Sequence, residues 1–329
     1  GNIPPRFRVF RTDPLSLRKA RPMSGKDKTD PVIPPHRSGA IEDPRLPLNP
    51  YSDDQQPWPG LVEKMEPVPD HGEQSYKGRD RLTGKRALVT GGDSGIGRAA
   101  AIAFAREGAD VAICYHPDEQ SDADSVIALI EAEGRTAVAL PADIRDEQAA
   151  RKVVDDALHQ LGGLEVLVLN AGRQQAQDSI ADITSEAFDA TMKTNIYAPF
   201  WMAQQALPHL QKGASIIATA SVNSYAPSRD LLDYAMTKAA DKAFAQALAK
   251  QLAPKGIRVN AVAPGPFWTA IQVSGGQPRD ALKDFGADTP LGRAGQPVEL
   301  APIYVLLASD EASYITGEVY AATGGSGTG

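Results

Sequence analysis

Tyr234 and Lys238 place a phenol and an ammonium four residues apart on a predicted helix over residues 232–253. This spacing puts both side chains on one face of the helix, one turn from each other. A free phenol loses its proton at about pH 10, but an adjacent cation favours the phenolate and brings it closer to neutral pH. The pair can therefore act as a general acid or base. A lone pair of this spacing is also typical of an exposed helix face.

Two further polar residues can join this pair. Ser221 follows the fifth predicted strand and stands thirteen residues before Tyr234, and Asn195 lies in a predicted helix over residues 185–210. Open parallel sheets bind ligands at the carboxyl edge of their strands, so a hydroxyl, an amide, a phenol and an ammonium can converge there. We expect a proton-transfer site formed by Asn195, Ser221, Tyr234 and Lys238.

A glycine-rich stretch over residues 90–97, Thr-Gly-Gly-Asp-Ser-Gly-Ile-Gly, follows the first predicted strand and opens the first predicted helix. Glycines allow a tight turn and a close approach of a pyrophosphate to the backbone, while the amino end of the helix faces the anion. This context predicts a bound dinucleotide, and the alternative is a tight turn without a ligand. The residues expected to bind the cofactor here are Gly91, Asp93, Ser94, Gly95, Ile96 and Gly97.

The type of dinucleotide depends on the end of the second predicted strand. A carboxylate there would bind the adenosine ribose hydroxyls and repel an added phosphate. The sequence reads Cys-Tyr-His over residues 114–116, without a carboxylate, an arginine or a lysine, while Asp93 adds negative charge nearby. NAD and NADP both stay open, with a slight preference for NAD. Tyr115, Asp143 and Ile144 are the expected cofactor contacts, although Asp143 can equally be an exposed loop acid.

The chain from about residue 81 onward contains the elements that must position these groups. Short apolar, β-branched runs alternate with longer helical patterns, which is typical of a parallel α/β sheet. We predict a single catalytic domain over residues 81–329 with a Rossmann-type, doubly wound, seven-stranded parallel sheet. The predicted strands are 86–90, 110–114, 136–140, 165–169, 215–219, 258–263 and 318–322, and the predicted helices are 96–107, 119–133, 147–161, 185–210, 232–253 and 297–308.

Residues 1–80 have a different composition. The first 70 residues hold 14 of the 26 prolines, which favours a partly irregular N-terminal extension. The first 28 residues carry eight Lys and Arg against two acids, and an organellar transit peptide is the minor alternative for them. Met23 is a candidate natural start. Trp58 either pins this arm to the domain or to a neighbouring subunit, or lies loosely in a tail.

Composition excludes several function classes. A net charge of −7 and a pI of about 5.3 argue against a nucleic-acid or anionic-membrane partner. No run of about 18 apolar residues occurs, so no membrane-spanning helix is predicted. The single Cys114 cannot close a disulfide within the chain, which favours a cytoplasmic location. Five scattered histidines without H-E-x-x-H or C-x-x-C spacing predict no metal site.

In their joint order these residues resemble the short-chain dehydrogenase/reductase superfamily over about residues 82–325. The resemblance rests on the 90–97 loop, Asn170-Ala171-Gly172, Asn195, Ser221, Tyr234 with Lys238, and Pro264-Gly265. The loop and the stretches 65–73 and 263–269 are similar to the bacterial branch related to glucose and ribitol dehydrogenases. The resemblance implies an NAD(P)-dependent oxidoreductase that acts on an alcohol or carbonyl, such as a sugar, polyol or aldehyde. It also implies a homotetramer.

The resemblance further implies a role for each site residue. Tyr234 is the proton donor or acceptor, Ser221 hydrogen-bonds the reacting oxygen, and Lys238 holds the nicotinamide ribose. Asn195 would support a water and proton relay. Further cofactor contacts implied in this way are Asn170, Ala171, Gly172, Pro264, Gly265 and Thr269. Leu169 departs from the family's usual Asn-Asn-Ala-Gly, so a side-chain amide contact is not expected at this position.

Two questions stay open at this level. A dinucleotide-binding sensor without turnover is the alternative function, although binding alone does not require the proton-transfer set. The substrate contacts are the second question, and the candidates are Gln174, Asn223, Tyr225 and Trp268. The segment 266–296 lacks a clear strand, and we expect it to include a substrate cover, with core packing as the alternative for its aromatic residues.

Overall fold

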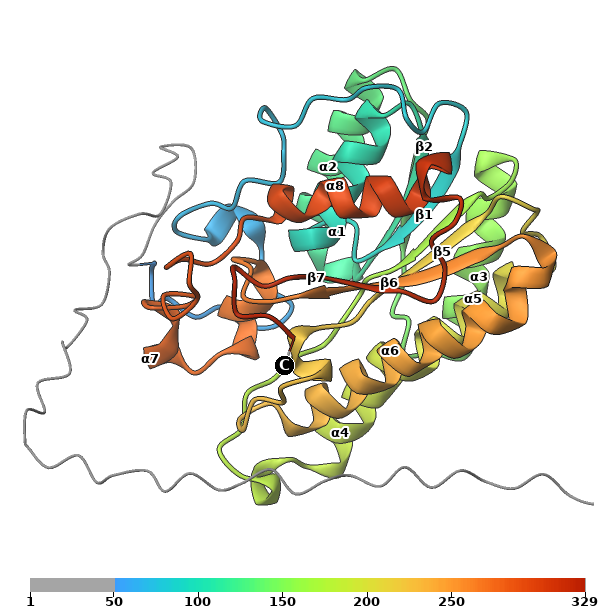
Figure 1. Cartoon of the computed structure of the whole chain (residues 1–329). Helices are drawn as coiled ribbons and strands as arrows, with labels where there is room; N and C mark the ends of the chain where they lie inside the picture. Colours follow the sequence, from blue (N-terminus) through green and yellow to red (C-terminus); the bar gives the residue numbers. More distant parts are fainter. Residues whose placement is uncertain (1–50, 329) are drawn as a thin grey trace, which may run out of the picture. The chain divides into compact units, whose positions relative to one another are not determined.

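The computed structural model describes residues 51–328 and contains the predicted seven-stranded parallel sheet (Figure 1). The strand order is β3-β2-β1-β4-β5-β6-β7, and every neighbouring pair is parallel. The order reverses between β1 and β4, and open α/β sheets bind ligands at the carboxyl ends of strands at such a switch point. The strands are β1 (Arg86–Thr90), β2 (Asp110–Tyr115), β3 (Ala137–Pro141), β4 (Val166–Leu169), β5 (Ser215–Thr219), β6 (Arg258–Pro264) and β7 (Val319–Ala322).

Helices cover both faces of the sheet. They are α1 (Gly95–Arg106), α2 (Gln120–Ala132), α3 (Glu147–Leu161), α4 (Ser185–Met192), α5 (Ala198–Ala206), α6 (Leu232–Leu252), α7 (Arg279–Leu282) and α8 (Pro297–Ala308). In Figure 1, α1, α2 and α8 lie on one face, and α3, α5 and α6 lie on the other. Leu88 of β1 packs into the core beside α3 and α5, whereas Val89 packs into the core beside α1 and α8. Both faces of the sheet are therefore apolar, as the runs without alternation predict.

The helix predicted over residues 185–210 is interrupted. After α4 the chain forms a π-helical turn, Lys193–Tyr197, before α5 begins at Ala198. Pro199 explains the interruption, because it has no amide hydrogen and its ring would clash with the Asn195 carbonyl in a regular α-helix. The wider turn lets the Ala198 amide donate to the Lys193 carbonyl. The prediction of one continuous helix was therefore wrong at the turn that carries Asn195.

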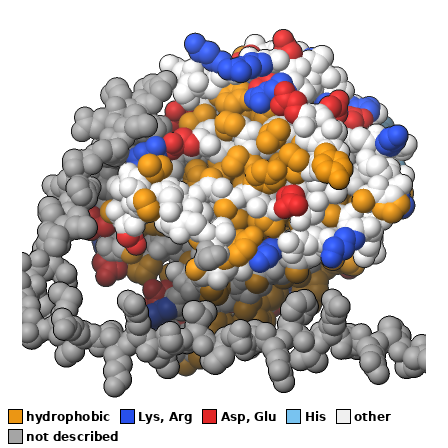
Figure 2. Space-filling view, viewed as in Figure 1, with side chains coloured by type: hydrophobic (Ala, Val, Ile, Leu, Met, Phe, Trp, Pro, Cys, Tyr) orange, Lys and Arg blue, Asp and Glu red, His pale blue; other side chains and the backbone are white. Residues whose placement is uncertain are grey.

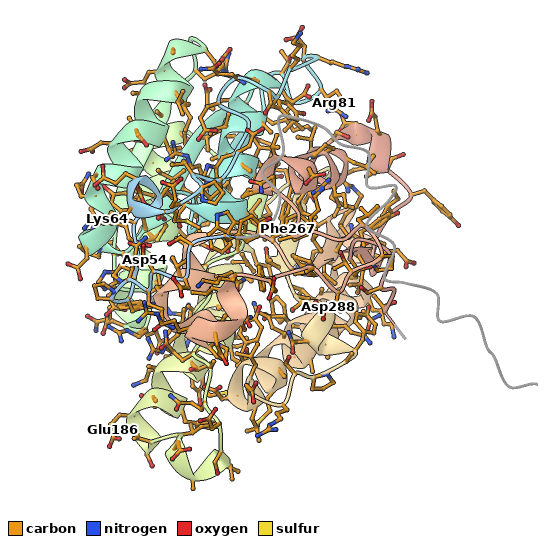
Figure 3. The ribbon with its side chains drawn as sticks, turned by 90° about the vertical axis from the view of Figure 1, so that its left-hand side faces the viewer. Asp54, Lys64, Arg81, Glu186, Phe267 and Asp288 are labelled. Carbon is orange, nitrogen blue, oxygen red and sulfur yellow. The ribbon has the colours of Figure 1, made fainter. Side chains whose placement is uncertain are left out.

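Residues 51–80 pass along the domain with one short 3-10 turn, η1 (Val62–Lys64). The Val62 amide donates to Asp122 Oδ2 near the start of α2, at 2.9 Å. Figure 3 shows this passage beside α2, from Asp54 to Lys64. The segment is therefore attached to the domain well before the first strand begins.

Some predictions about the N-terminal part stay predictions. The division of the chain at residue 80 is one of them, and the basic residues of positions 1–28 and Met23 lie outside the described residues. Within residues 51–328, no helix is long and apolar enough to span a bilayer. In the same part of the chain, no group of three or more His, Cys, Asp or Glu side chains is arranged to hold a metal ion.

Glu107, the residue that follows α1, ties the N-terminal segment to the domain. Its carboxylate is fully buried and accepts hydrogen bonds from the Tyr76 hydroxyl (2.5 Å), from the Arg81 guanidinium (2.6 Å) and from the Arg79 and Arg81 amides (2.8 and 3.0 Å). Burial alone would raise the pKa of Glu107, but these donors outweigh it and lower the pKa to about 2. The charged carboxylate therefore stabilises the fold.

We predict that Glu107→Gln lowers the free energy of unfolding at pH 7 by about 3 kcal/mol. The folded pKa lies below the ordinary value of 4.5, so the stabilisation is fully present above that pH and is lost as the pH falls toward 2. Urea unfolding of both chains at several pH values measures this, with the exposed Glu131→Gln as the control. A difference between Glu107→Gln and wild type that stays constant as the pH falls from 4.5 would contradict the assignment.

Candidate active site

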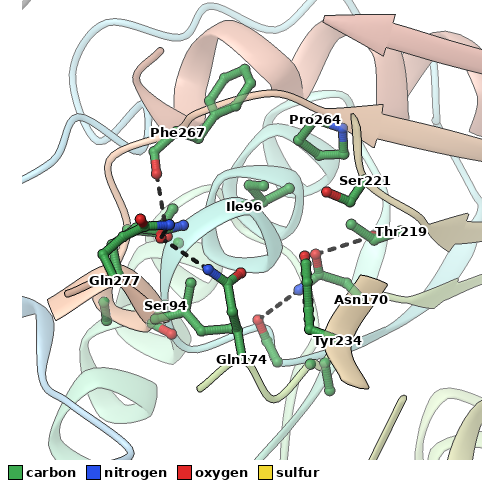
Figure 4. A pocket seen from close by; sticks show the side chains of 18 of the residues that line it. Ser94, Ile96, Asn170, Gln174, Thr219, Ser221, Tyr234, Pro264, Phe267 and Gln277 are labelled. Carbon is green, nitrogen blue, oxygen red and sulfur yellow. Dashed lines mark hydrogen bonds between the residues drawn. The ribbon is translucent and has the colours of Figure 1, made fainter. Parts of the chain in front are cut away.

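A cavity of about 730 Å³ lies at the carboxyl ends of the central strands. Figure 4 shows Ser94 and Ile96 from the glycine-rich loop around the same space as Ser221 and Tyr234. Of the predicted site residues, only Gly97 and Asn195 do not line it. The predicted residues that line the cavity are Gly91, Asp93, Ser94, Gly95, Ile96, Tyr115, Asp143, Ile144, Asn170, Ala171, Gly172, Ser221, Tyr234, Lys238, Pro264, Gly265 and Thr269.

The glycine-rich loop leaves the amino end of α1 open toward the cavity. The Ser94 side chain makes no capping hydrogen bond, and the Arg98 amide is the first to bond within the helix, to the Ser94 carbonyl (3.0 Å). The preceding amides are therefore available to an anion such as a pyrophosphate. Gly97 lies behind the loop, where a Cβ atom would stand 1.9 Å from the Gly91 carbonyl oxygen. Glycine is required there so that the helix can pack against the loop.

Asn170, directly after β4, fixes the loop to the sheet. Its backbone amide and that of Ala171 donate to Thr90 Oγ1 at 2.8 and 3.0 Å. Its side-chain amide donates to the carbonyls of Thr90 and Gly91 at 3.1 and 3.3 Å. The amide oxygen accepts from Thr219 Oγ1 at 3.2 Å. One side chain thus connects β1, β4 and β5 beneath the cavity.

Tyr234 and Lys238 lie on the side of α6 that faces the cavity, and both are buried. Lys238 Nζ lies 5.6 Å from the centre of the Tyr234 ring. The ammonium donates to the Thr219 carbonyl (2.7 Å) and to Asp241 Oδ2 (2.9 Å). Burial opposes the charge of Lys238, but the Asp241 carboxylate and Tyr234 raise its pKa above the ordinary value. The amine therefore stays an ammonium beside the phenol.

Ser221 begins a short 3-10 turn two residues after β5. Its Oγ accepts a hydrogen bond from the Asn223 amide at 3.1 Å. No described residue accepts the Ser221 O–H, so this hydroxyl can donate to a ligand oxygen in the cavity.

Asn195 is fully buried behind the cavity and does not touch it. Its Oδ1 accepts from the Arg173 amide (2.7 Å), and its Nδ2 donates to the Arg173 carbonyl (3.0 Å) and to Thr237 Oγ1 (2.9 Å). The side chain therefore connects the loop after β4 to α6. The π-helical turn holds Asn195 in this position, where it contacts Thr237 of α6 but does not reach the cavity.

Two carboxyl groups line the end of the cavity at which the resemblance would place an adenosine, called the adenosine end below. Asp93 is 1% exposed, and neither of its oxygens has a hydrogen-bond donor among the described residues. Glu119, at the start of α2, also lines the cavity. Burial raises the pKa of both groups, and the negative charge of Asp93 raises that of Glu119 further. Burial and the repulsion between the two groups therefore favour the protonated form of one of them, which leaves about one negative charge near neutral pH.

Asp143 does not stand free in its loop. Its carboxylate accepts three hydrogen bonds from the Arg145 guanidinium, at 2.5, 2.9 and 3.0 Å. These hydrogen bonds lower the pKa of Asp143. Tyr115 is also partnered, since its hydroxyl donates to Gln120 Oε1 at 2.9 Å. Both predicted residues line the cavity with their polar groups already paired.

Two of the four substrate candidates reach the cavity. Gln174 and Asn223 line it, and Gln174 Nε2 donates to the Gly276 carbonyl at 2.6 Å. Tyr225 does not line it, and Trp268 was placed wrongly, because its ring is fully buried and stacks on Tyr51 with centroids 4.3 Å apart. Core packing is therefore the role of Trp268.

The chain is similar to known proteins over most of its length. A family model described as Enoyl-(Acyl carrier protein) reductase matches residues 91–326. The chain belongs to the short-chain dehydrogenase/reductase superfamily. Among members of this superfamily, the oxidoreductase YghA of Escherichia coli is 58% identical over 275 residues, which are 84% of this chain and 94% of that protein. The glucose and ribitol dehydrogenase of Daucus carota is 42% identical over 276 residues, 82% of this chain and 94% of that protein.

Solved structures of short-chain dehydrogenases/reductases have a similar fold. The enzyme from Burkholderia cenocepacia in complex with NADP is 39% identical, has a TM-score of 0.69 and covers 74% of this chain and 98% of its own. The 3-ketoacyl-(acyl-carrier-protein) reductase of Brucella melitensis complexed with NADH is 32% identical, has a TM-score of 0.67 and covers the same shares. The chain is thus an oxidoreductase of the short-chain dehydrogenase/reductase type.

Sequence reasoning missed several residues of this dehydrogenase/reductase site. Asp241 could have been found, because an acid three residues after Lys238 lies on the same helix face. Glu119 carried a weaker signal, because it is the second carboxylate that follows the second strand. Thr219 takes part through its backbone carbonyl, which no residue type reveals. Trp58 lines the cavity from far upstream, and only the tertiary structure shows this.

Proposed function

We propose that this protein is an NAD(P)-dependent oxidoreductase that transfers a hydride between the nicotinamide and an alcohol or carbonyl substrate. The observation that carries the proposal is the presence of Ser221, Tyr234 and Lys238 in one cavity with the open amino end of α1. A dinucleotide-binding sensor would need the helix end but not the three proton-transfer groups. The geometry therefore favours an enzyme over a sensor.

The residues around the cavity fit a nicotinamide dinucleotide. The amides at the start of α1 and the glycine cradle at Gly97 suit a pyrophosphate, and the unpartnered oxygens of Asp93 suit ribose hydroxyls. Asp143 and Ile144 would hold the adenine edge. Pro264, Gly265 and Thr269 would line the nicotinamide end. A bound nicotinamide supplies or accepts the hydride.

The chain's own residues manage the proton. Tyr234 donates its phenolic proton to the carbonyl oxygen in reduction and removes the hydroxyl proton in oxidation. Ser221 donates a hydrogen bond to the same oxygen and limits the charge that develops there. The Lys238 ammonium favours the phenolate, and Thr219 and Asp241 hold it in place. Asn195 positions the loop after β4 against α6 and so acts through other residues.

NAD is the cofactor that the adenosine end favours. Asp93 and Glu119 together carry negative charge where the ribose hydroxyls would lie, and a 2′-phosphate would be repelled there. Arg145 offers little compensation, because Asp143 already binds its guanidinium. The related structures with NADP and with NADH leave both cofactors open for the family, so this preference rests on the two carboxyl groups.

A neutral, polyhydroxylated or carbonyl substrate such as a sugar, polyol or aldehyde suits the other end. Amide groups of Gln174 and Asn223 can hydrogen-bond hydroxyls there. Three exposed carboxylates, Asp280, Asp284 and Asp288, also line this end and would repel an anionic substrate. The similarity to a glucose and ribitol dehydrogenase agrees with this substrate class.

The oligomeric state and the cellular location remain predictions. On α8, Pro302 is exposed and Ile303 and Leu306 are half-buried, and Figure 2 shows hydrophobic side chains gathered over this part of the face. Tyr197 and Phe200 at α5 are also about half exposed, at 48% and 49%. Such apolar helix faces support the homotetramer that the resemblance implies. The buried free Cys114 is consistent with the predicted cytoplasmic location.

We predict that Tyr234→Phe lowers kcat/KM by about 10²–10⁴-fold with little change in the Kd for NADH, because it removes only the proton donor. Steady-state nicotinamide absorbance assays over sugars, polyols and aldehydes measure the rate, and calorimetry measures the Kd. Tyr225→Phe, which removes a hydroxyl outside the cavity, is the control. Unchanged turnover in Tyr234→Phe would exclude this phenol as the proton donor.

For cofactor preference, we predict that the double variant Asp93→Asn, Glu119→Gln shifts the ratio of Kd values toward NADPH by about tenfold, because the negative charge at the ribose is lost. Fluorescence titrations with NADH and NADPH give the two Kd values. Asp118→Asn, an exposed neighbour outside the cavity, provides the matched control. The assignment of the carboxyl pair fails if the double variant keeps the wild-type ratio.

A further inference from the structure

A short loop upstream of the sheet, residues 56–61, lies at the mouth of the cavity, and we call it the strap. On one side, the Gln56 amide donates to the Val273 carbonyl (2.9 Å) in the segment after β6. On the other side, the Val62 amide donates to Asp122 at the start of α2. Trp58 and Pro59 line the cavity between these two attachments. The strap therefore connects the two sides of the cofactor site.

The strap has a defined conformation. Gln56 Nε2 donates to the Leu61 carbonyl (3.0 Å), and the Leu61 amide donates back to Gln56 Oε1 (2.8 Å), so one side chain closes the loop. Gly60 lies against the domain with a φ of +79°, where a Cβ atom would stand 3.0 Å from Ser274 Cβ. These contacts hold Trp58 at the tip of the loop.

Trp58 meets three loops that follow three different strands. Its ring contacts His116, after β2, edge to face, with centroids 4.8 Å apart. The guanidinium carbons of Arg145, after β3, and Arg173, after β4, lie 5.6 and 5.5 Å from the ring centre. Of these residues, His116 and Arg145 line the cavity together with Asp143 and Asp93, where the proposed function places the adenosine.

Core packing does not explain this position. Trp58 is half-buried and belongs to none of the apolar clusters in the described part of the chain. Its neighbours are polar or charged, and Nε of Arg173 is buried without an acceptor among the described residues. An indole beside two guanidinium groups at the edge of a cavity is typical of a surface on which a flat ring stacks.

We propose that Trp58 is a cofactor-binding residue whose indole closes the adenosine end of the cavity and stacks on the adenine ring. The inference rests on the proposed NAD(P) function. The strap precedes residue 91, where the family match begins, so it adds a contact from outside the matched region. Adenine has a flat π-face, and aromatic side chains stack on such faces without needing hydrogen bonds to the edges of the base.

The test compares binding of whole cofactor and of its halves. Isothermal titration calorimetry gives Kd values of wild type, Trp58→Ala and Trp58→Phe for NADH, AMP and nicotinamide mononucleotide. We expect Trp58→Ala to weaken NADH and AMP by about tenfold or more and to leave the mononucleotide unchanged. Trp58→Phe should retain most of the affinity because a ring remains. Val68→Ala, at an exposed position of the same segment, should match wild type.

The outcomes separate the two proposals. If wild type binds neither NAD(H) nor NADP(H), the proposed function fails, and this inference fails with it. If wild type binds NADH and Trp58→Ala binds it equally well, or if AMP and the mononucleotide weaken alike, only the role of Trp58 is overturned. Should Trp58→Ala not fold, fluorescence decides: AMP should quench the indole emission of wild type and of Trp201→Phe but not that of Trp58→Phe. Equal quenching in all three would contradict stacking on Trp58.

Discussion

The site depends on a buried ammonium. Lys238 is 4% exposed, and a cation removed from water at this depth is costly unless charged and polar groups surround it. The Thr219 carbonyl at the end of β5 and the Asp241 carboxylate on α6 provide those partners. The same ammonium lies beside the Tyr234 ring. In the proposed reaction, the contact that fixes α6 against the sheet would therefore also prepare the phenol for proton transfer.

A second set of contacts joins the glycine-rich loop, the sheet and α6. Asn170 connects β1, β4 and β5 beneath the cavity, and Asn195 connects the loop after β4 to α6. Neither side chain has to touch a substrate to matter, because Asn170 holds the glycine-rich loop on the sheet and Asn195 holds the loop after β4 against the helix that carries Tyr234. The N-terminal segment adds to this frame, since its strap is attached on both sides of the cavity.

The strands and most of the helices could be predicted from the sequence, because the patterns that indicate them are local. Apolar runs between helical patterns located all seven strands to within a residue or so, and the spacing of Tyr234 and Lys238 gave their common helix face. The π-helical turn at Asn195 was missed, since the effect of Pro199 was not weighed against a long helical pattern. Trp58 could not be placed in the site, because only tertiary contacts bring this residue to the cavity. Trp268 was misassigned because its partner, Tyr51, lies more than two hundred residues away.

The most direct test of the central claim is a crystal structure of the protein with NAD bound. The account predicts the nicotinamide ring in the cavity with its reactive carbon on the side of Tyr234, and Lys238 still paired with Asp241 and directed at the nicotinamide ribose. A nicotinamide bound elsewhere, or a Tyr234 hydroxyl directed away from the ring, would contradict the claim that this phenol and its neighbouring ammonium carry out the proton transfer.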